Sequence, residues 1–409
     1  MTSAQVQDPY VAGLRFLIVE DHGFQRWTLG HYLEQLGAKT VFNAGDGQTA
    51  LEMYKSADPP VDIIITDLNM PGMDGIQFVH HVADFGKPVG LVLVTAQEAV
   101  LPSVEAMTRE YGVNLLAAIK KPVTAEILRT AIARYRWPPE RDSGKDSAPG
   151  SSLPLERIVE GLDNDELEPF FQPEVELSNR AIRSAQVLPR WRHPSDGIVA
   201  LEEFLPALEA SGHADQLATE MLRKALPTCK SWRIAGIGAT VSVPLSLSLL
   251  ADVTLVDRLM ETVRESQVDP RHVVFEVGEP PATGDLGKAL ENLSRFRLYG
   301  FGLSLDGHVP GPSSAAELAR FPFTEVKVDL SSVRGGGKDL RRAVLEAALA
   351  TAKALRGTAI ADGVESAEEM VVLRDIGYEV VQGPFIAAPM KASDFLRWGV
   401  DYKVRAAAR

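Results

Sequence analysis

The sequence predicts two α/β domains in tandem, a doubly wound parallel sheet of five strands followed by a TIM-like α/β barrel. The chain has 409 residues, which is too long for one ordinary hydrophobic core. Strand-like apolar runs alternate with amphipathic helical patterns on both sides of residues 138–152, a stretch rich in Pro, Gly, Ser and charge. We therefore predict a first domain over residues 1–137, a linker over 138–152 and a barrel domain over 153–409.

In the first domain, short apolar runs are separated by helical patterns. Apolar positions at helical spacing cover residues 23–36, and a second predicted helix, 124–136, leads toward the linker. Strands that alternate with helices predict a parallel sheet with helices on both faces. Four of the five predicted strands are residues 15–19, 61–66, 89–94 and 115–119, which are the first, third, fourth and fifth.

The second domain has the length of one α/β barrel, about 250 residues. Reactive groups in such barrels lie at the carboxyl ends of the strands, and four acidic residues fall there, Glu276, Asp306, Asp329 and Asp362. The predicted helices include residues 214–226, 284–297 and 338–356. The predicted strands are residues 169–177, 182–188, 239–243, 272–277, 301–306, 324–329, 358–361 and 379–382.

Composition and charge exclude several classes of protein. The net charge of −13 argues against a phosphate backbone as the main partner, so we expect no nucleic acid. Cys229 is the single cysteine, which rules out an intrachain disulfide. No apolar run reaches the roughly 18 residues that a membrane-spanning helix needs. These features favour a reduced, cytoplasmic setting with no membrane partner.

The first candidate site gathers charged residues at strand ends. Glu20 and Asp21 close the first predicted strand, Asp67 closes the third, Thr95 the fourth, and Lys121 follows the fifth. These ends converge at one edge of a doubly wound sheet. Carboxylates that meet there repel each other unless a hard cation such as Mg²⁺ lies between them. Strand ends also carry Asp and Thr as simple caps, but the whole set in this order favours a site.

The expected chemistry of this site is phosphoryl acceptance. Asp67 is the nucleophile toward an incoming phosphoryl group, while the metal and Lys121 neutralise the charge that develops. The hydroxyl of Thr95 is then placed to donate a hydrogen bond to a phosphoryl oxygen. Thr95 and Lys121 are therefore the predicted switch residues.

Three motifs resemble the signatures of response-regulator receiver domains, which have a flavodoxin- and CheY-like fold. They are Val-Glu-Asp, Thr-Asp-Leu-Asn-Met-Pro-Gly-Met-Asp-Gly and Lys-Lys-Pro, and the match covers about residues 13–136. The resemblance implies Mg²⁺, an aspartyl phosphate on Asp67, and a cognate histidine kinase or phosphotransfer protein as phosphodonor. It also implies that the backbone carbonyl of Asn69 completes the metal site.

One position departs from the receiver pattern. Many receivers carry an aromatic switch residue three positions before the lysine, where this chain has Ala118. Two explanations stay open. In the first, the coupled rotation of the threonine and an aromatic side chain is absent, and phosphorylation is transmitted through the 124–136 helix and dimerisation. In the second, Ala118 only reflects a subfamily with different packing.

Further motifs resemble EAL-type cyclic-di-GMP phosphodiesterases, over about residues 153–399. They include Phe-Phe-Gln-Pro at 170–173 and Leu-Pro-Arg-Trp-Arg-His-Pro at 188–194. A receiver followed directly by this barrel is similar to response regulators of the RocR type. Active members hydrolyse a phosphodiester bond with two divalent ions. The family positions that this chain retains are Arg190, Glu276, Asp306, Lys327, Asp329, Glu365 and Gln382.

Four family positions are substituted. The signature glutamate is Gln186, the asparagine ligand is Ser242, the second aspartate of the paired acids is Gly307, and the Glu-Gly-Val-Glu motif begins with Asp362. Gln186 and Gly307 remove two negative charges from a site that must hold two dications. Even the loss of a residue that only orients a metal ligand costs about 10–100-fold in metal affinity or activity. The resemblance therefore argues against barrel-domain metals.

The leading hypothesis is a phosphorylation-controlled response regulator whose degenerate EAL output is a cyclic-di-GMP receptor or a protein-interaction module. The Gln186 amide can still form hydrogen bonds and Arg190 can still pair with phosphate, but Pro384 replaces an aromatic residue usual in the family. Lys327 and Asp329 have a purely structural alternative, an ion pair at the barrel mouth. The alternative function is a weak phosphodiesterase that yields linear pGpG. Relatives also lead us to expect a homo-oligomer.

Overall fold

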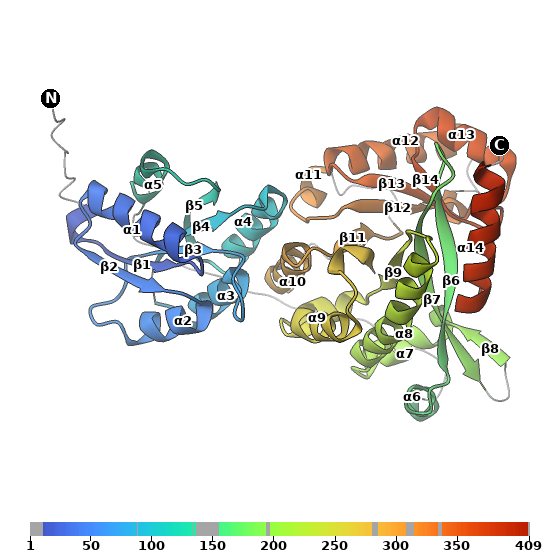
Figure 1. Ribbon diagram of the computed structural model, residues 1–409, viewed down its shortest axis with the longest axis horizontal. Helices are drawn as coiled ribbons and strands as arrows, with labels where there is room; N and C mark the ends of the chain where they lie inside the picture. Colours follow the sequence, from blue (N-terminus) through green and yellow to red (C-terminus); the bar gives the residue numbers. More distant parts are fainter. Residues whose placement is uncertain are drawn as a thin grey trace. The chain divides into compact units, whose positions relative to one another are not determined.

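The computed structural model describes residues 11–87, 89–133, 135, 155–193, 197–279, 285–307, 315–333 and 338–407. The chain divides into two compact units (Figure 1). The first unit contains residues 1–145 together with residues 284–298, and the second contains 146–283 and 299–409. The predicted linker, 138–152, lies outside the described residues, so its bounds stay a prediction.

The first unit is built on a five-stranded parallel sheet with the strand order β2-β1-β3-β4-β5. This confirms the predicted doubly wound domain. The strands are β1 (Arg15–Val19), β2 (Thr40–Ala44), β3 (Ile63–Asp67), β4 (Gly90–Thr95) and β5 (Asn114–Lys120). The helices are η1 (Val11–Gly13), α1 (Gly23–Leu36), α2 (Gly47–Ser56), α3 (Gly75–Phe85), η2 (Glu98–Val100), α4 (Leu101–Glu110) and α5 (Ala125–Ile132).

Burial of the central strands explains why they form. Every residue of β3 and β4 is buried, as a parallel strand covered by helices on both faces requires. The strand order reverses between β1 and β3, so the carboxyl ends of these two strands flank the crevice in which doubly wound sheets bind ligands. Helix α5 ends at Ile132, earlier than the predicted residue 136.

Helix α10 (Leu286–Leu298) belongs to the first unit, although it follows a strand of the barrel in the sequence. Its Arg295 Nε lies 2.7 Å from Asp74 Oδ2, and both side chains are fully buried. Asp74 also caps α3 by accepting a hydrogen bond from the Gln77 amide at 2.8 Å. On the same helix, Ser294 Oγ donates to Ser103 Oγ of α4 at 2.8 Å. These buried polar contacts fix α10 against α3 and α4.

The second unit is a closed barrel of eight strands. The order is β6-β14-β13-β12-β11-β10-β9-β7, and an additional β6–β7 pairing closes the ring, with β8 attached to β7. The barrel confirms the predicted fold class with one difference, because β6 runs antiparallel to both β7 and β14. The strands are β6 (Leu167–Glu176), β7 (Ile182–His193), β8 (Gly197–Ala200), β9 (Thr240–Pro244), β10 (Val273–Val277), β11 (Gly302–Leu305), β12 (Glu325–Asp329), β13 (Thr358–Asp362) and β14 (Val380–Val381).

Helices separate and cover the barrel strands. The longest is α8, which spans 21 residues and buries Trp232 and Cys229. In the part of the chain that the structure describes, no helix is both long and apolar enough to cross a membrane. The helical segments are α6 (Leu155–Asp163), α7 (Leu201–Ala210), α8 (Ala214–Ile234), η3 (Leu247–Ala251), α9 (Leu255–Ser266), η4 (Pro270–His272), α11 (Ala315–Leu318), η5 (Leu330–Val333), α12 (Lys338–Ala354), α13 (Ala367–Ile376) and α14 (Ala392–Ala407).

The barrel interior is unusually polar. Barrels of this kind are normally filled by branched apolar side chains. Here the buried polar side chains of the barrel strands and of the residue that follows β14 are Gln172, Glu174, Ser184, Gln186, Ser242, Glu276, Ser304, Glu325, Lys327 and Gln382. Because a buried polar group without a partner is costly, most of these side chains bind one another. Among the described residues, Glu325 pairs with Arg183 instead, and Ser304 Oγ has no hydrogen-bond partner.

Candidate functional sites

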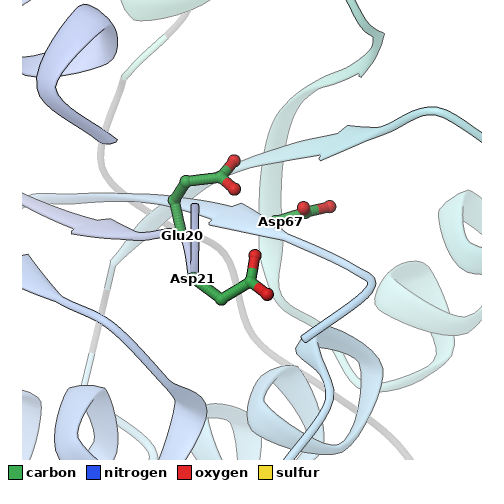
Figure 2. A group of neighbouring side chains, drawn as sticks. All are labelled: Glu20, Asp21 and Asp67. Atoms are coloured by element: carbon green, nitrogen blue, oxygen red, sulfur yellow. The ribbon is translucent and has the colours of Figure 1, made fainter. Parts of the chain in front are cut away.

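The predicted acidic site of the first unit is formed at the carboxyl ends of β1 and β3. Figure 2 shows the side chains of Glu20, Asp21 and Asp67 turned toward a common space. One carboxylate oxygen from each residue lies within 4.8 Å of the other two. Among the described residues, this is the only such group of three or more His, Cys, Asp or Glu side chains. Its hard oxygen donors fit a divalent cation such as Mg²⁺.

Lys121 joins this acidic group from the end of β5. Its Nζ lies 2.7 Å from Asp67 Oδ2 and 2.9 Å from Glu20 Oε2. Burial raises the pKa of Glu20, the nearby Asp67 carboxylate raises it further, and Lys121 only partly offsets both. Burial lowers the pKa of Lys121, but its hydrogen bonds to Asp67 and Glu20 outweigh this and raise it. The site therefore holds more negative charge than one ammonium neutralises.

The remaining predicted residues of the first site also lie near Asp67. The Asn69 amide donates to Asp67 Oδ1 at 3.2 Å, so the loop after β3 folds back toward the Asp67 carboxylate. Thr95 ends β4 and is fully buried, and its Oγ1 accepts a hydrogen bond from the Gln97 amide at 3.0 Å. Ala118 lies on β5 opposite Leu93. The structure thus brings the predicted set together, while the role of each residue stays a prediction.

In the barrel, Lys327 lies at the centre of the polar interior and is only 1% exposed. Its Nζ donates to Glu276 Oε1 and, at 3.3 Å, to Gln382 Oε1. It also forms an ion pair of 2.7 Å with Glu174 Oε1. Burial lowers the pKa of Lys327, but Glu174 and then Glu276 outweigh this and hold it well above its usual value. Lys327 is therefore a charged lysine held by two carboxylates.

The substituted residues Gln186 and Ser242 both bind Glu276. Gln186 Nε2 donates to Glu276 Oε2 at 2.6 Å, and Ser242 Oγ donates to Glu276 Oε1 at 2.8 Å. Gln382 Nε2 donates in turn to Gln186 Oε1 at 2.5 Å. The amide orientations agree with one another, since each nitrogen faces an acceptor and each oxygen a donor. With Lys327, both oxygens of Glu276 are therefore occupied by protein donors.

Three further acids of the predicted pocket, the retained Asp306 and Asp329 and the substituted Asp362, accept hydrogen bonds from nearby backbone amides. Asp306 Oδ1 accepts from the Gly307 amide at 2.9 Å, and Asp362 Oδ1 from the Gly363 amide at 2.6 Å. Burial raises the pKa of Asp306 and of Asp362, and Lys327 only partly offsets this. Asp329 Oδ1 accepts from the Ser331 amide at 2.8 Å, and Glu365 is exposed.

Two further positions bear on the predicted pocket. Gly307 has a φ of 66°, in the left-handed region that favours glycine, so an aspartate there would carry a backbone cost. Arg190 is half-buried on β7, and its guanidinium donates to the Pro189 carbonyl at 3.0 Å. Residues 308–312, which follow Gly307, lie outside the described residues.

Glu174 is fully buried on β6 and contacts Lys327, and no pattern described above pointed to it. Nor did any pattern point to the pair of Arg183 and Glu325, whose side chains lie 3.0 Å apart. The available signal was strand parity, since Glu174 is two residues from Gln172 and so faces the same side of β6. This alternation shows which residues share a face of β6, but it does not show which face points into the barrel until the closure of the barrel is known.

The comparisons with known proteins define the class of this chain. Residues 155–389 match the EAL domain and residues 16–133 match the response regulator receiver domain. The chain therefore belongs to the EAL domain family, in the branch with a receiver domain at the N-terminal side. This confirms the resemblances found in the sequence.

Particular relatives share the whole arrangement or part of it. Cyclic di-GMP phosphodiesterase RocR of Pseudomonas aeruginosa is 31% identical over 388 residues, covering 94% of this chain and 98% of the relative. Cyclic di-GMP phosphodiesterase PdeR of Escherichia coli is 32% identical over 250 residues, 61% of this chain but only 38% of the relative. The PaMucR phosphodiesterase in its c-di-GMP complex has a TM-score of 0.55 and 28% identity, covering 59% of this chain and 98% of that structure.

Proposed function

We propose that this protein is a phosphorylation-controlled response regulator whose barrel does not hydrolyse cyclic-di-GMP and acts as a receptor for that nucleotide or as a protein-interaction module. The receiver match and the acidic group at Asp67 support the first half of the proposal. The arrangement of donors around Glu276 supports the second half.

In the receiver, a carboxylate oxygen of Asp67 attacks the phosphorus of a phosphohistidine donor. The new P–O bond forms as the P–N bond breaks, and the histidine nitrogen leaves with the electron pair. Lys121, 2.7 Å from Asp67, stabilises the negative charge of the transferred group. Glu20, Asp21, Asp67 and the Asn69 carbonyl would hold Mg²⁺, which supplies the additional positive charge that this transfer requires.

One observation carries the proposal for the barrel. The Gln186 amide lies 2.6 Å from Glu276 Oε2 and donates a hydrogen bond to it. A carboxylate at position 186 would face Glu276 across the same short gap, and the two anions would need a cation between them. The amide satisfies Glu276 directly. Because Ser242 and Lys327 occupy the other oxygen, the residues present do not fit a site for two metal ions.

A second candidate function is phosphodiesterase activity, which the similarity to RocR favours. This relative is named as a cyclic di-GMP phosphodiesterase and matches nearly the full length of the chain. In that case the barrel would cleave one phosphodiester bond of cyclic-di-GMP to give linear pGpG, with weakened activity because two family carboxylates are missing.

Turnover separates the two functions. The purified full-length protein is incubated with cyclic-di-GMP and Mg²⁺ or Mn²⁺, with and without beryllofluoride, and pGpG is quantified by chromatography. The proposal predicts no metal-dependent pGpG. Hydrolysis at rates ordinary for the family would refute the non-catalytic function. Calorimetry with cyclic-di-GMP then divides the two non-catalytic possibilities, because heat of binding favours a receptor and its absence at high micromolar nucleotide favours a protein partner.

A further inference from the structure

Glu174 is a fully buried carboxylate to which the family resemblance assigns no role. It lies in β6 opposite Ser184 of β7, whose hydroxyl donates to Glu174 Oε2. Its other oxygen, Oε1, lies 2.7 Å from Lys327 Nζ as an ion pair, without the angle of a regular hydrogen bond. Both oxygens thus contact partners inside the barrel.

The register places Glu174 one layer deeper in the barrel than Gln186. Gln172 pairs with Gln186 in the β6–β7 ladder, and Glu174 pairs with Ser184. Gln186 in turn aligns with Ser242 of β9, and Ser184 aligns with Thr240. Residues two apart on a strand share a face, so positions 174 and 186 line the same interior on neighbouring strands.

The charge balance around Lys327 makes these two positions alternatives. Glu174 and Glu276 both contact the single ammonium of Lys327, so carboxylates already outnumber the cation, and Glu174 is the stronger of the two in favouring the charged lysine. A carboxylate at position 186 would add a third anion beside one buried cation. Its partner Glu276 already has a pKa raised by burial, despite Lys327, so the interior tolerates no further negative charge easily.

We propose that Glu174 is the positioning residue that holds Lys327 in this metal-free barrel, and that it stands in place of a carboxylate at position 186. The barrel accommodates an acid at position 174 or at position 186, but not at both. With Gln186→Glu alone, Lys327 therefore stays paired with Glu174. Lys327 becomes available to the new glutamate only when Glu174 is changed as well. The inference deepens the proposed function and rests on it only in taking the barrel to lack a metal pair.

Calorimetric unfolding of the full-length protein tests this coupling. We expect Gln186→Glu to lower the Tm of the barrel transition by about 5–15 °C, as for an uncompensated buried charge. Adding Glu174→Gln to that variant should recover at least half of the loss. The matched control adds Glu176→Gln, a change of the same kind on the same strand at a half-buried position, and should recover none. Independent, additive losses from Glu174→Gln and Gln186→Glu would overturn the proposal.

A second cycle keeps the proposal testable if Gln186→Glu does not fold. Lys327→Met removes the cation and leaves Glu174 and Glu276 facing each other without it. Adding Glu174→Leu should then raise the Tm relative to Lys327→Met alone, whereas adding Glu176→Leu should not. If Glu174→Leu lowers the Tm further in the Lys327→Met background, Glu174 is not the counter-ion of Lys327 and the proposal fails.

These readouts are separate from the proposed function. Turnover by the unchanged protein decides whether the barrel is an enzyme, whereas the two cycles measure only the energetic coupling of position 174 with positions 186 and 327. A protein that hydrolyses cyclic-di-GMP yet shows the coupling would refute the proposed function and the metal-free premise, and only the pairing of Glu174 with Lys327 would stand. An inactive protein without the coupling would do the reverse.

Discussion

The acidic group of the receiver and the interior of the barrel contain similar residues, but their carboxylates have different hydrogen-bond partners. In the receiver, three carboxylates converge and Lys121 contacts two of them, Glu20 and Asp67. In the barrel, Lys327 also contacts two carboxylates, but Gln186 and Ser242 add neutral donors to Glu276. Glu276 has hydrogen-bond donors on both of its oxygens, whereas Glu20 and Asp67 of the receiver share the ammonium of Lys121. We therefore expect acidic residues at strand ends to form a metal site only where neighbouring donors leave carboxylate oxygens free to bind a cation.

The largest expected effect is on phosphorylation. Asp67→Asn should abolish labelling of the protein by a small phosphodonor such as acetyl phosphate, because the amide cannot form the acyl phosphate. The measurement is a phosphate-affinity gel with Mg²⁺ present. Asp62→Asn, at a carboxylate that precedes the opposite end of β3 and accepts from the Arg15 amide, is the control and should be labelled normally. Retained labelling of Asp67→Asn would place the acceptor elsewhere.

The next effect compares the two lysines. Lys327→Met should destabilise the barrel by about 3–5 kcal/mol, since it leaves two buried carboxylates without their cation. Lys121→Met should cost the receiver less, because Lys121 is 19% exposed and a bound cation can replace its charge. Denaturant unfolding followed by circular dichroism measures both. If Lys327→Met and Lys121→Met lose the same unfolding free energy in the presence of Mg²⁺, a bound cation does not replace the charge of Lys121 and the proposed difference between the two sites is wrong.

Metal addition should stabilise the receiver and leave the barrel unchanged. At a concentration about 100 times its Kd, Mg²⁺ should raise the unfolding free energy of the receiver by about 2.7 kcal/mol. Calorimetric scans with Mg²⁺ or EDTA provide the measurement, with Asp21→Asn as the variant that should lose the effect. A Mg²⁺-dependent rise in the Tm of the barrel transition in Asp21→Asn would show that the barrel binds the ion, and would contradict the claim that protein donors occupy both oxygens of Glu276.

The smallest effect is a pH dependence of barrel stability. Burial raises the pKa of Glu325 to about 7, the Glu174 carboxylate adds to this, and Arg183 partly offsets both. Since the folded pKa exceeds the unfolded one, this contribution is fully present below pH 4.5 and is lost as the pH rises toward 7. The slope should be about 1 kcal/mol per pH unit at most.

The measurement is urea unfolding of the barrel between pH 5 and pH 7. Glu325→Gln should flatten the dependence, whereas Glu176→Gln should not. If the two variants show the same slope as the unchanged protein, Glu325 does not titrate in this window and the pKa assignment is wrong.

Much of the fold was predictable because strand and helix patterns are local. The positions of Glu20, Asp67 and Lys121 at strand ends followed from where apolar runs stop, and the structure brings all three together. The antiparallel direction of β6 did not follow, since a period of two residues carries no direction along the chain. The four residues of β8 are too few to show any periodicity.

The polar network of the barrel was predictable only in part. Gln186, Ser242 and Lys327 were identified from family positions, yet their mutual contacts depend on how eight strands close. Glu174 could not be assigned to the interior from the sequence, because a single acid in a strand can face either solvent or the core. Only its pairing with Ser184 of β7 shows that it faces the core. The packing of α10 with α3 and α4 likewise depends on buried Arg295, which local sequence presents as an ordinary charged helix residue.

The count of divalent ions bound per chain tests the central claim most directly. Mn²⁺ is titrated into the full-length protein and into Asp21→Asn, and bound ion is followed by electron paramagnetic resonance. Because protein donors occupy both oxygens of Glu276, we predict one bound ion per chain, in the receiver. Asp21→Asn should weaken or abolish the binding of that ion. Two further ions that persist in Asp21→Asn would show that the barrel holds a metal pair, and the account of its interior would be wrong.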